Sequence, residues 1–308
     1  MEFGIVLPIS SQRLGWDTIL NIAKEAELLG YDSVWVSDHF ISPSGSVYTL
    51  EPWTVLSALA LVTNKIRLGT YVLCNQYRHP SLLAKMTVTL DHISKGRLDL
   101  GIGAGWIKAE HETFGFEWKR FNVRLQRLKE TLEIIRKLWT ENNVSYSGQF
   151  FQLKNANLQP KPFQKPHPPV WVGGNSRAIM HIIAELGDGW IPALPTPTQL
   201  QEGVSLIEEL MKDFGRKNTR LQVAFGGSGC TVIAKDSSKV EKLAEPLVKS
   251  MAKPIEDLPC IVGTPEQCIR RIKELQKSGA KKIVAGFMDL PSLEGMRLFA
   301  ESVIPHFK

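Results

Sequence analysis

The dipeptide Asp38-His39 places a carboxylate beside an imidazole, two groups that together can carry out acid–base catalysis. Histidine has an unperturbed pKa close to neutral pH, and a neighbouring carboxylate can fix its tautomer and increase its basicity. The pair follows a short β-branched run at 33–36, so we predict that it lies at the end of a strand. We therefore predict that His39 donates and accepts a proton in a reaction. The alternative is that Asp38 and His39 only cap the loop that follows.

Two glycine-containing segments could hold the polar parts of a ligand. The first, Gly101-Ile102-Gly103-Ala104-Gly105-Trp106, ends a predicted strand, and its glycines would let a ligand approach the backbone amides. The second, Val172-Gly173-Gly174-Asn175-Ser176, leads into a predicted helix that Asn175 or Ser176 would cap, and helix N-termini commonly bind phosphate. Packing relief in the first segment and a plain turn in the second are the alternatives. Together with His39, the two segments indicate a planar cofactor that carries a phosphate.

The elements that would position these residues alternate regularly along the chain. Short β-branched runs predict eight strands, at 3–7, 33–36, 66–73, 97–102, 169–172, 189–191, 222–232 and 282–285. Amphipathic segments predict at least one helix after each strand, at 17–29, 51–63, 80–93, 120–139, 176–186, 198–214, 237–250 with 265–278, and 292–304. Eight such units predict an α/β fold, the closed (β/α)8 TIM barrel, because only closure pairs both edges of the parallel sheet.

Two stretches exceed a minimal barrel and predict insertions after strand 4 and strand 7. Residues 144–153 have the pattern of a hairpin and lead into a proline-rich connector, whereas 251–264 is irregular. Both are too short for a separate domain, so we expect residues 1–308 to form a single domain. Active sites of such barrels lie at the carboxyl ends of the strands, which would bring His39 and the two glycine segments to one face.

The composition of the chain excludes several classes of function. The 308 residues include 37 Lys and Arg against 31 Asp and Glu, and because this excess of +6 is dispersed we expect no nucleic-acid binding. The apolar runs are shorter than the roughly 20 residues of a membrane span, so we expect no membrane contact. The first eight residues have a strand pattern rather than that of a leader, and we expect a cytoplasmic protein.

The residues of metal, thiol and hydrolase chemistry show no matching pattern. The four cysteines form no C-x-x-C pair and are expected to be reduced thiols. The seven histidines lack metal-ligand spacing, so we predict no metal, and we interpret Glu110-His111-Glu112 as the solvated face of a helix. The chain has no G-x-S-x-G and no G-x-x-x-x-G-K-[ST] motif, and Trp106 takes the place of the last glycine of the dinucleotide-binding fingerprint.

A series of longer motifs points to a known family. They are Ser37-Asp38-His39-Phe40, Arg78-His79-Pro80 with Ala84-Lys85 and Leu90-Asp91, Ser94-Lys95-Gly96-Arg97, the segment 101–106, the segment 169–176, and Gly187-Asp188-Gly189-Trp190. On these motifs the chain resembles the luciferase-like flavin or deazaflavin oxidoreductases over essentially its whole length. Within that superfamily it is most similar to the coenzyme F-420-dependent oxidoreductases.

This resemblance implies a (β/α)8 barrel in which Asp38 and His39 face the cofactor ring and His39 exchanges a proton during hydride transfer. It also implies that the end of strand 3 supports the ring, with a non-prolyl cis peptide at Tyr71-Val72. The cofactor-binding residues that we expect on this basis are Asp38, Val72, Cys74, Ala104, Gly105, Gly173, Gly174, Asn175 and Ser176.

The function expected from the resemblance is hydride transfer between coenzyme F-420, a deazaflavin, and a small alcohol, carbonyl compound or activated alkene. One alternative is a two-component monooxygenase that takes reduced flavin mononucleotide (FMN) from a partner flavin reductase. A second alternative is a protein that binds a flavin-like ligand without catalysis. We also expect a homodimer. Relatives that oxidise glucose 6-phosphate look to carry a glutamate where this chain has Trp106, which argues against that reaction, although Glu110 could partly substitute.

Overall fold

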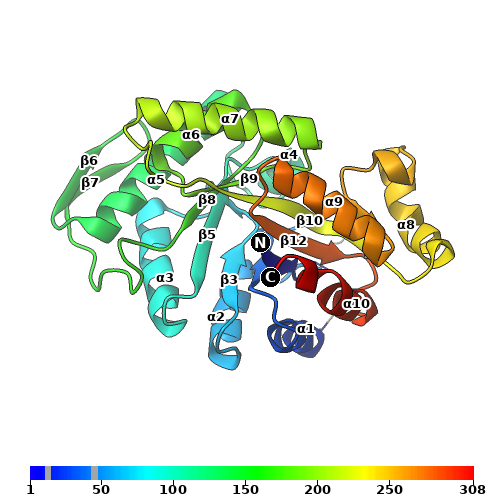
Figure 1. Ribbon diagram of the computed structural model, residues 1–308. Coiled ribbons are helices and arrows are strands. Elements are labelled where there is room, and N and C mark those ends of the chain that lie inside the picture. Colours follow the sequence, from blue (N-terminus) through cyan, green and yellow to red (C-terminus); the bar gives the residue numbers. More distant parts are fainter. Residues whose placement is uncertain (11–14, 43–47) are drawn as a thin grey trace.

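Eight parallel strands close into a barrel in the computed structural model, which describes residues 1–10, 15–42 and 48–308 (Figure 1). The barrel strands are β1 (Glu2–Val6), β2 (Ser33–Val36), β3 (Arg67–Thr70), β5 (Leu98–Gly103), β8 (Val170–Gly173), β9 (Gly189–Ile191), β10 (Gln222–Ile233) and β12 (Lys282–Phe287). They pair in this order, β12 returns to β1, and β10 lies between β9 and β12. Closure is completed where Gln222 pairs with Gly189 and Val223 with Trp190. The predicted (β/α)8 TIM barrel is therefore confirmed.

At least one helix follows each barrel strand, and one helix of each unit packs on the outer side of the barrel (Figure 1). These helices are α1 (Trp16–Leu28), α2 (Pro52–Val62), α3 (Pro80–Ile93), α5 (Phe121–Thr140), α6 (Arg177–Leu186), α7 (Pro197–Asp213), α9 (Pro265–Lys277) and α10 (Glu294–Ser302). A short 3-10 helix, η2 (Ile304–His306), follows α10, and the N-terminal ammonium of Met1 donates a hydrogen bond to the carbonyl of Phe307 at 3.2 Å. The described residues contain no helix long and apolar enough to cross a membrane.

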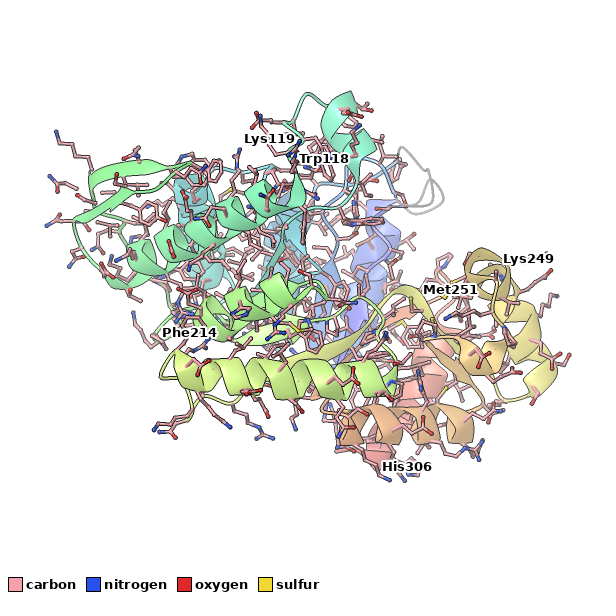
Figure 2. The ribbon with its side chains drawn as sticks, turned by 90° about the horizontal axis from the view of Figure 1, so that it is seen from above. Trp118, Lys119, Phe214, Lys249, Met251 and His306 are labelled. Carbon is pink, nitrogen blue, oxygen red and sulfur yellow. The ribbon has the colours of Figure 1, made fainter. Side chains whose placement is uncertain are left out.

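The insertions lie where the sequence predicts them and contain more regular structure than expected. After β5 the chain forms α4 (Lys108–Thr113), and beyond α5 comes the expected hairpin, β6 (Val144–Ser147) with β7 (Gln152–Ala156). After β10 come α8 (Ser237–Met251), a 3-10 helix η1 (Ile255–Asp257) and β11 (Ile261–Gly263). Lys249 and Met251 lie in the last turn of α8, on the side of the molecule that this insertion forms (Figure 2).

Two strand predictions need correction. The segment 251–264 was expected to be irregular, but its last residues form β11, because β10 is twelve residues long and its final residues offer a further edge for pairing. The predicted strand at 66–73 is interrupted, since β3 ends at Thr70 and a separate strand, β4 (Leu73–Cys74), pairs with β5. The interruption lies at a cis peptide between Tyr71 and Val72, which confirms that prediction.

Two tryptophan side chains are the largest members of the cluster that fills the barrel interior. Trp35 from β2 and Trp171 from β8 meet edge to face with their ring centroids 5.7 Å apart. Neighbouring strands carry glycine opposite each ring: a Cβ atom at Gly69 would lie 2.2 Å from Trp35, and one at Gly189 would lie 2.3 Å from Trp171. Because interiors are packed as closely as organic crystals, the tryptophans and glycines are matched, and the barrel is a core rather than a pore.

A buried ionic cluster closes the barrel at the amino-terminal ends of its strands. Asp99 accepts hydrogen bonds from the Nε of Arg67 at 2.8 Å and from its Nη2 at 3.0 Å, and the Nζ of Lys282 lies 4.0 Å from the same carboxylate. Lys282 also pairs with Glu2 at 3.0 Å. Burial alone would raise the pKa of Asp99, but the positive charges of Lys282 and Arg67 outweigh it and lower the pKa. This cluster stabilises the end of the barrel opposite His39.

Candidate active site

A cavity of about 540 Å³ opens at the carboxyl ends of the barrel strands. It is lined by every residue that the sequence predicts for the site, namely Asp38, His39, Val72, Cys74, Ala104, Gly105, Gly173, Gly174, Asn175 and Ser176. These residues come from the ends of β2, β4, β5 and β8, so the closure of the barrel brings together segments that are up to 138 positions apart in the sequence. The described residues contain no group of three or more His, Cys, Asp or Glu side chains that could hold a metal ion.

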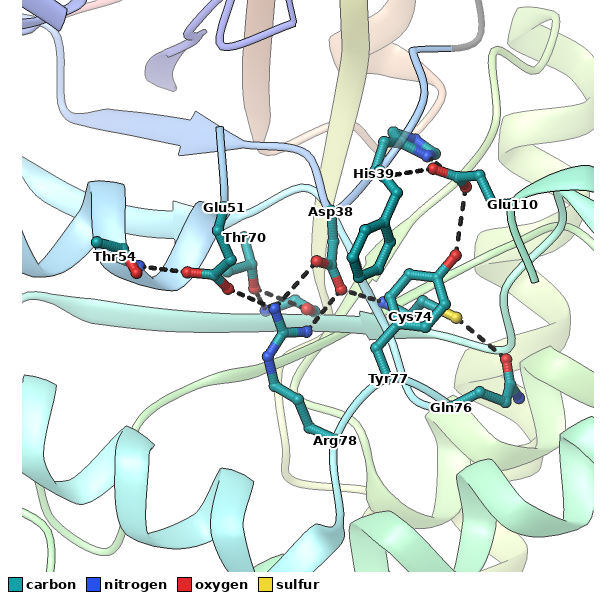
Figure 3. A network of polar contacts seen from close by, with 12 residues as sticks. Asp38, His39, Glu51, Thr54, Thr70, Cys74, Gln76, Tyr77, Arg78 and Glu110 are labelled. Atoms are coloured by element: carbon teal, nitrogen blue, oxygen red, sulfur yellow. Dashed lines mark hydrogen bonds and ion pairs between the residues drawn. The ribbon is translucent and has the colours of Figure 1, made fainter. Parts of the chain in front are cut away.

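The imidazole of His39 faces the carboxylate of Glu110, which lies on α4 (Figure 3). The distance from Nδ1 of His39 to Oε2 of Glu110 is 3.1 Å. The other oxygen of Glu110 accepts hydrogen bonds from the backbone amides of Phe40 at 2.5 Å and Ile41 at 2.9 Å. The hydroxyl of Tyr77 lies 3.3 Å from Oε2. Glu110 thus joins α4 to the loop that carries His39.

The interpretation of Glu110-His111-Glu112 as a solvated helix face is wrong for its first two members. The side chain of Glu110 is only 2% exposed, and His111 is buried with its Nδ1 2.9 Å from the carbonyl of Ile107. Only Glu112 points to solvent, where it pairs with Lys108. The reason is that α4 is short and folds over the barrel mouth instead of lying on its outer wall, a placement that the spacing of charges does not reveal.

Asp38 does not pair with His39, contrary to the prediction. Its carboxylate accepts hydrogen bonds from the guanidinium of Arg78 at 2.7 and 3.1 Å and from the backbone amide of Cys74 at 2.9 Å (Figure 3). Arg78 in turn binds Glu51, the N-cap of α2, at 2.6 Å. The carboxylate that can fix the tautomer of His39 is therefore that of Glu110.

The glycines of β5 and the last residue of β8 are matched to Val72 and to the backbone before it. A Cβ atom at Gly103 would lie 3.0 Å from the Val72 side chain, and one at Gly173 would lie 2.9 Å from it. A Cβ atom at Gly101 would lie 1.9 Å from the carbonyl oxygen of Thr70. Gly101 and Gly103 thus make room for neighbouring groups, Gly103 also lines the cavity, and Val72 reaches the cavity because those strands have no side chain there. Beside it, burial raises the pKa of the Cys74 thiol to about 12, so this group stays protonated.

The N-terminus of α6 forms one edge of the cavity. Ser176 is its cap and accepts a hydrogen bond from the amide of Ile179 at 3.3 Å, whereas the Asn175 side chain binds the amide and carbonyl of Ala193. The amide of Gly174 donates to Ile191 at 3.1 Å, so it is already engaged. The first amides of a helix lack partners within the helix, and because Ser176 takes that of Ile179, the amides of Arg177 and Ala178 are the ones left as donors for an anion.

Sequence reasoning missed one wall of the cavity. Gly226, Gly227, Ser228 and Cys230 of β10 line it, and the hydroxyl of Tyr71 donates a hydrogen bond to the carbonyl of Gly226 at 2.8 Å. The segment 222–232 was predicted as an uninterrupted strand, but its pairing with β12 shifts between Gly227 and Thr231. The run Gly226-Gly227-Ser228-Gly229 was the available signal, because glycine inside a strand often marks such an irregularity.

Aromatic side chains stand at the rim of the cavity. Trp106 is 67% exposed, and its ring meets the imidazole of His39 edge to face at 6.0 Å. Phe121, at the start of α5, also lines the cavity. Nearby, Arg124 stacks on Trp118 with 3.7 Å between the guanidinium carbon and the ring centroid, and it binds the carbonyl of Gly105 at 2.7 Å. Trp118 and Lys119 lie in the loop between α4 and α5 (Figure 2).

Comparisons with known proteins agree with this architecture. A family model described as luciferase-like monooxygenase matches residues 1–282. The 5,10-methylenetetrahydromethanopterin reductase of Archaeoglobus fulgidus is 30% identical over 349 residues, which cover 100% of both chains. The F420-dependent glucose-6-phosphate dehydrogenase of Amycolatopsis mediterranei is 27% identical over 331 residues, which cover 97% of each chain.

Flavin-dependent enzymes are similar to the chain to about the same degree. The FMNH(2)-dependent dimethylsulfone monooxygenase of Pseudomonas putida is 26% identical over 341 residues, which cover 98% of this chain and 91% of the relative. Among solved structures, monooxygenase RslO1 from Streptomyces bottropensis superimposes with a TM-score of 0.84 at 26% identity and 100% coverage of both chains.

Proposed function

Because the chain belongs to the luciferase-like monooxygenase family and is an oxidoreductase, we propose that it transfers a hydride between coenzyme F-420 and a small organic substrate, with His39 as proton donor and acceptor. The observation that carries this proposal is the pairing of His39 with a buried carboxylate at the wall of a cavity that also includes a helix N-terminus. One part of the cavity wall could thus transfer a proton, and another could bind an anion. An uncharged carbonyl, alcohol or activated alkene is the substrate class that needs such a proton.

The residues of the cavity fit the proposed cofactor. We assign the ring to the wall formed by Val72, Cys74, Ala104 and Gly105, behind which Asp38 holds the backbone of Cys74. We assign the phosphate to the segment Gly173-Gly174-Asn175-Ser176 and the first amides of α6. When bound, a deazaflavin supplies a ring carbon that accepts and returns a hydride.

The chain itself contributes the proton and the orientation. Since Nδ1 of His39 faces Glu110, Nε2 is the nitrogen that we assign to the oxygen of the substrate. In its neutral form an imidazole held in this way can take a proton on Nε2 from an alcohol as it becomes a carbonyl compound, and the resulting imidazolium can return that proton to the carbonyl oxygen in the reverse direction. Trp106 has no acid–base group at the place where glucose-6-phosphate-oxidising relatives look to carry a glutamate, so we propose a different substrate.

The main alternative is a monooxygenase that uses reduced FMN, and the similarity to the dimethylsulfone monooxygenase favours it. Such an enzyme would depend on a partner flavin reductase. A protein that only binds a flavin-like ligand would keep its affinity but show no turnover. Cofactor binding separates the first two possibilities, and replacement of His39 tests the third.

Titration of the purified protein with each oxidised cofactor should show tighter binding of coenzyme F-420 than of FMN at low salt. The oligoglutamate tail of coenzyme F-420 is anionic, and contacts to an exposed tail weaken as salt shortens the Debye length from about 10 Å to about 3 Å. The difference in affinity should therefore narrow as the ionic strength rises from about 0.1 to 1 M. Tighter FMN binding at every ionic strength, with oxygen consumed when the flavin is reduced, would favour the monooxygenase instead.

We further propose that the protein is a homodimer that uses the outer faces of α2 and α3. The eleven residues of α2 include no charged side chain, and Leu61 on its outer face is 77% exposed. On α3, Leu82 and Ile93 are also exposed, and the two helices lie side by side (Figure 1). A helix that is apolar on all sides is normally buried, and large exposed apolar patches mark interaction sites.

Light scattering at micromolar concentration should therefore give the mass of two chains, and Leu61→Lys should shift it towards one. A lysine at this position would bring a desolvated charge into the interface. Phe214→Lys is the matched control, because Phe214 is an exposed apolar residue at the C-terminal end of α7, a helix that lies across the barrel from α2 (Figure 1). A wild-type protein with the mass of a single chain would exclude this interface.

A further inference from the structure

We propose that Glu110 is the positioning residue of His39, which it holds with the proton on Nδ1 and with Nε2 directed to the substrate. This inference rests on the proposed role of His39. It adds a residue that the sequence pattern assigned to the solvated face of a helix. It concerns a side chain on α4, outside the strand ends that carry the other candidate residues.

Each oxygen of the Glu110 carboxylate has its own partners. Oε1 accepts from the amides of Phe40 and Ile41, and Oε2 faces Nδ1 of His39 and the hydroxyl of Tyr77. An ionised carboxylate only accepts hydrogen bonds, so the ring nitrogen that faces it must be the one that carries hydrogen. The neutral imidazole is then an Nδ1–H tautomer, whose Nε2 has a lone pair available for proton transfer.

The partners also fix the position of the carboxylate. Phe40 and Ile41 directly follow His39, so a single side chain holds both the loop and the ring (Figure 3). Tyr77 comes from the loop before α3, and its burial, reinforced by nearby negative charges that include Glu110, raises its pKa well above the usual range, so that it remains a donor. Three segments of the chain thus meet at Glu110, which is buried in their midst.

The variant Glu110→Gln separates positioning from a purely structural role. The amide oxygen of glutamine can still accept from Phe40 and Ile41 and hold the loop. Its NH₂ group would then face His39 as a donor, so Nδ1 would have to accept and the proton would move to Nε2. The shape of the site would be kept while the tautomer would be reversed.

Imidazole ¹⁵N NMR of the purified protein without cofactor tests this directly, with the His39 signals assigned from their loss in His39→Ala. We expect an Nδ1–H tautomer in the wild type and an Nε2–H tautomer in Glu110→Gln. Glu112→Gln is the matched control, because Glu112 lies on the same helix but is exposed, and it should leave the wild-type tautomer unchanged. A wild-type proton on Nε2, or a tautomer that is the same in Glu110→Gln, would overturn the proposal, and the wild-type spectrum is decisive even if the variant does not fold.

Kinetics provide a second readout. With reduced coenzyme F-420 and a panel of small aldehydes, ketones and enones, Glu110→Gln should lower kcat about 10²-fold, within the range for losing a general acid, because the imidazolium that donates the proton from Nε2 loses the carboxylate that stabilises it at Nδ1. The affinity for oxidised coenzyme F-420 should stay within a few-fold of the wild type, whereas equal losses in affinity and kcat would indicate a structural role only. If the tautomer depends on Glu110 but His39→Ala turns over normally, the proposed function fails while the contact between Glu110 and His39 stands.

Discussion

His39→Ala is expected to lower the turnover of the enzyme by about 10²- to 10⁴-fold, the usual effect of losing a positioned acid or base. His39 combines a side chain suited to proton transfer near neutral pH with a place in the cavity wall and a buried carboxylate at Nδ1. Alanine leaves no group that could take over the proton, while the ring and phosphate regions that we assign to the cofactor are untouched. The affinity for coenzyme F-420 should therefore change by only a few-fold.

The loss is measured with reduced coenzyme F-420 and the best substrate from the panel of aldehydes, ketones and enones, followed by the return of the absorbance of the oxidised coenzyme. His306→Ala is the matched control, because His306 is an exposed histidine near the C-terminus and away from the cavity (Figure 2). Normal turnover of His39→Ala would remove the residue from the mechanism and, if no variant of the cavity affects turnover, would favour a protein that only binds the cofactor.

Asp99→Asn should lower the free energy of unfolding by about 3–5 kcal/mol, the usual cost of removing one partner of a buried ion pair. The asparagine keeps the shape of the side chain but removes the negative charge. Arg67 would then lose its paired carboxylate, and Lys282, which is almost completely buried, would keep the exposed Glu2 as its ion-pair partner besides the rings of Trp35 and Trp171. Because this cluster lies at the opposite end of the barrel from the cavity, cofactor affinity at a temperature where the variant is folded should be unchanged.

Chemical denaturation of both proteins across pH tests the same cluster. The pKa of Asp99 is lower in the folded protein than its unfolded value of about 3.9, so its ionic contribution is complete above that pH and is lost as the pH falls through the folded value. The difference between wild type and Asp99→Asn should be constant from about pH 5 to 8 and should shrink below about pH 4. Asp213→Asn, at the exposed end of α7, is the control. An equal loss in that variant would contradict the role of the cluster.

Much of the fold followed from local patterns in the sequence. The alternation of β-branched runs with amphipathic segments predicted all eight barrel strands and a helix after each, because strand and helix periodicities are properties of short windows. The eight units then imply closure, and closure implies that strand ends such as 37–40, 101–106 and 172–176 meet at one face. For this reason the predicted site residues line one cavity even though no single motif identifies it.

Contacts between distant side chains were decided only by the tertiary structure. Asp38 was expected beside His39, yet it binds Arg78, forty positions away, and His39 instead faces Glu110, seventy-one positions away. Neither pairing has a local signature, since it depends on how the loop after β2 turns and on the fold of α4 over the barrel mouth. The same holds for the amide of Gly174, which the neighbouring strand engages. The sequence therefore determined which residues reach the cavity, and the packing of the loops determined which of them meet, because side-chain direction outside regular elements depends on long-range contacts rather than on periodicity.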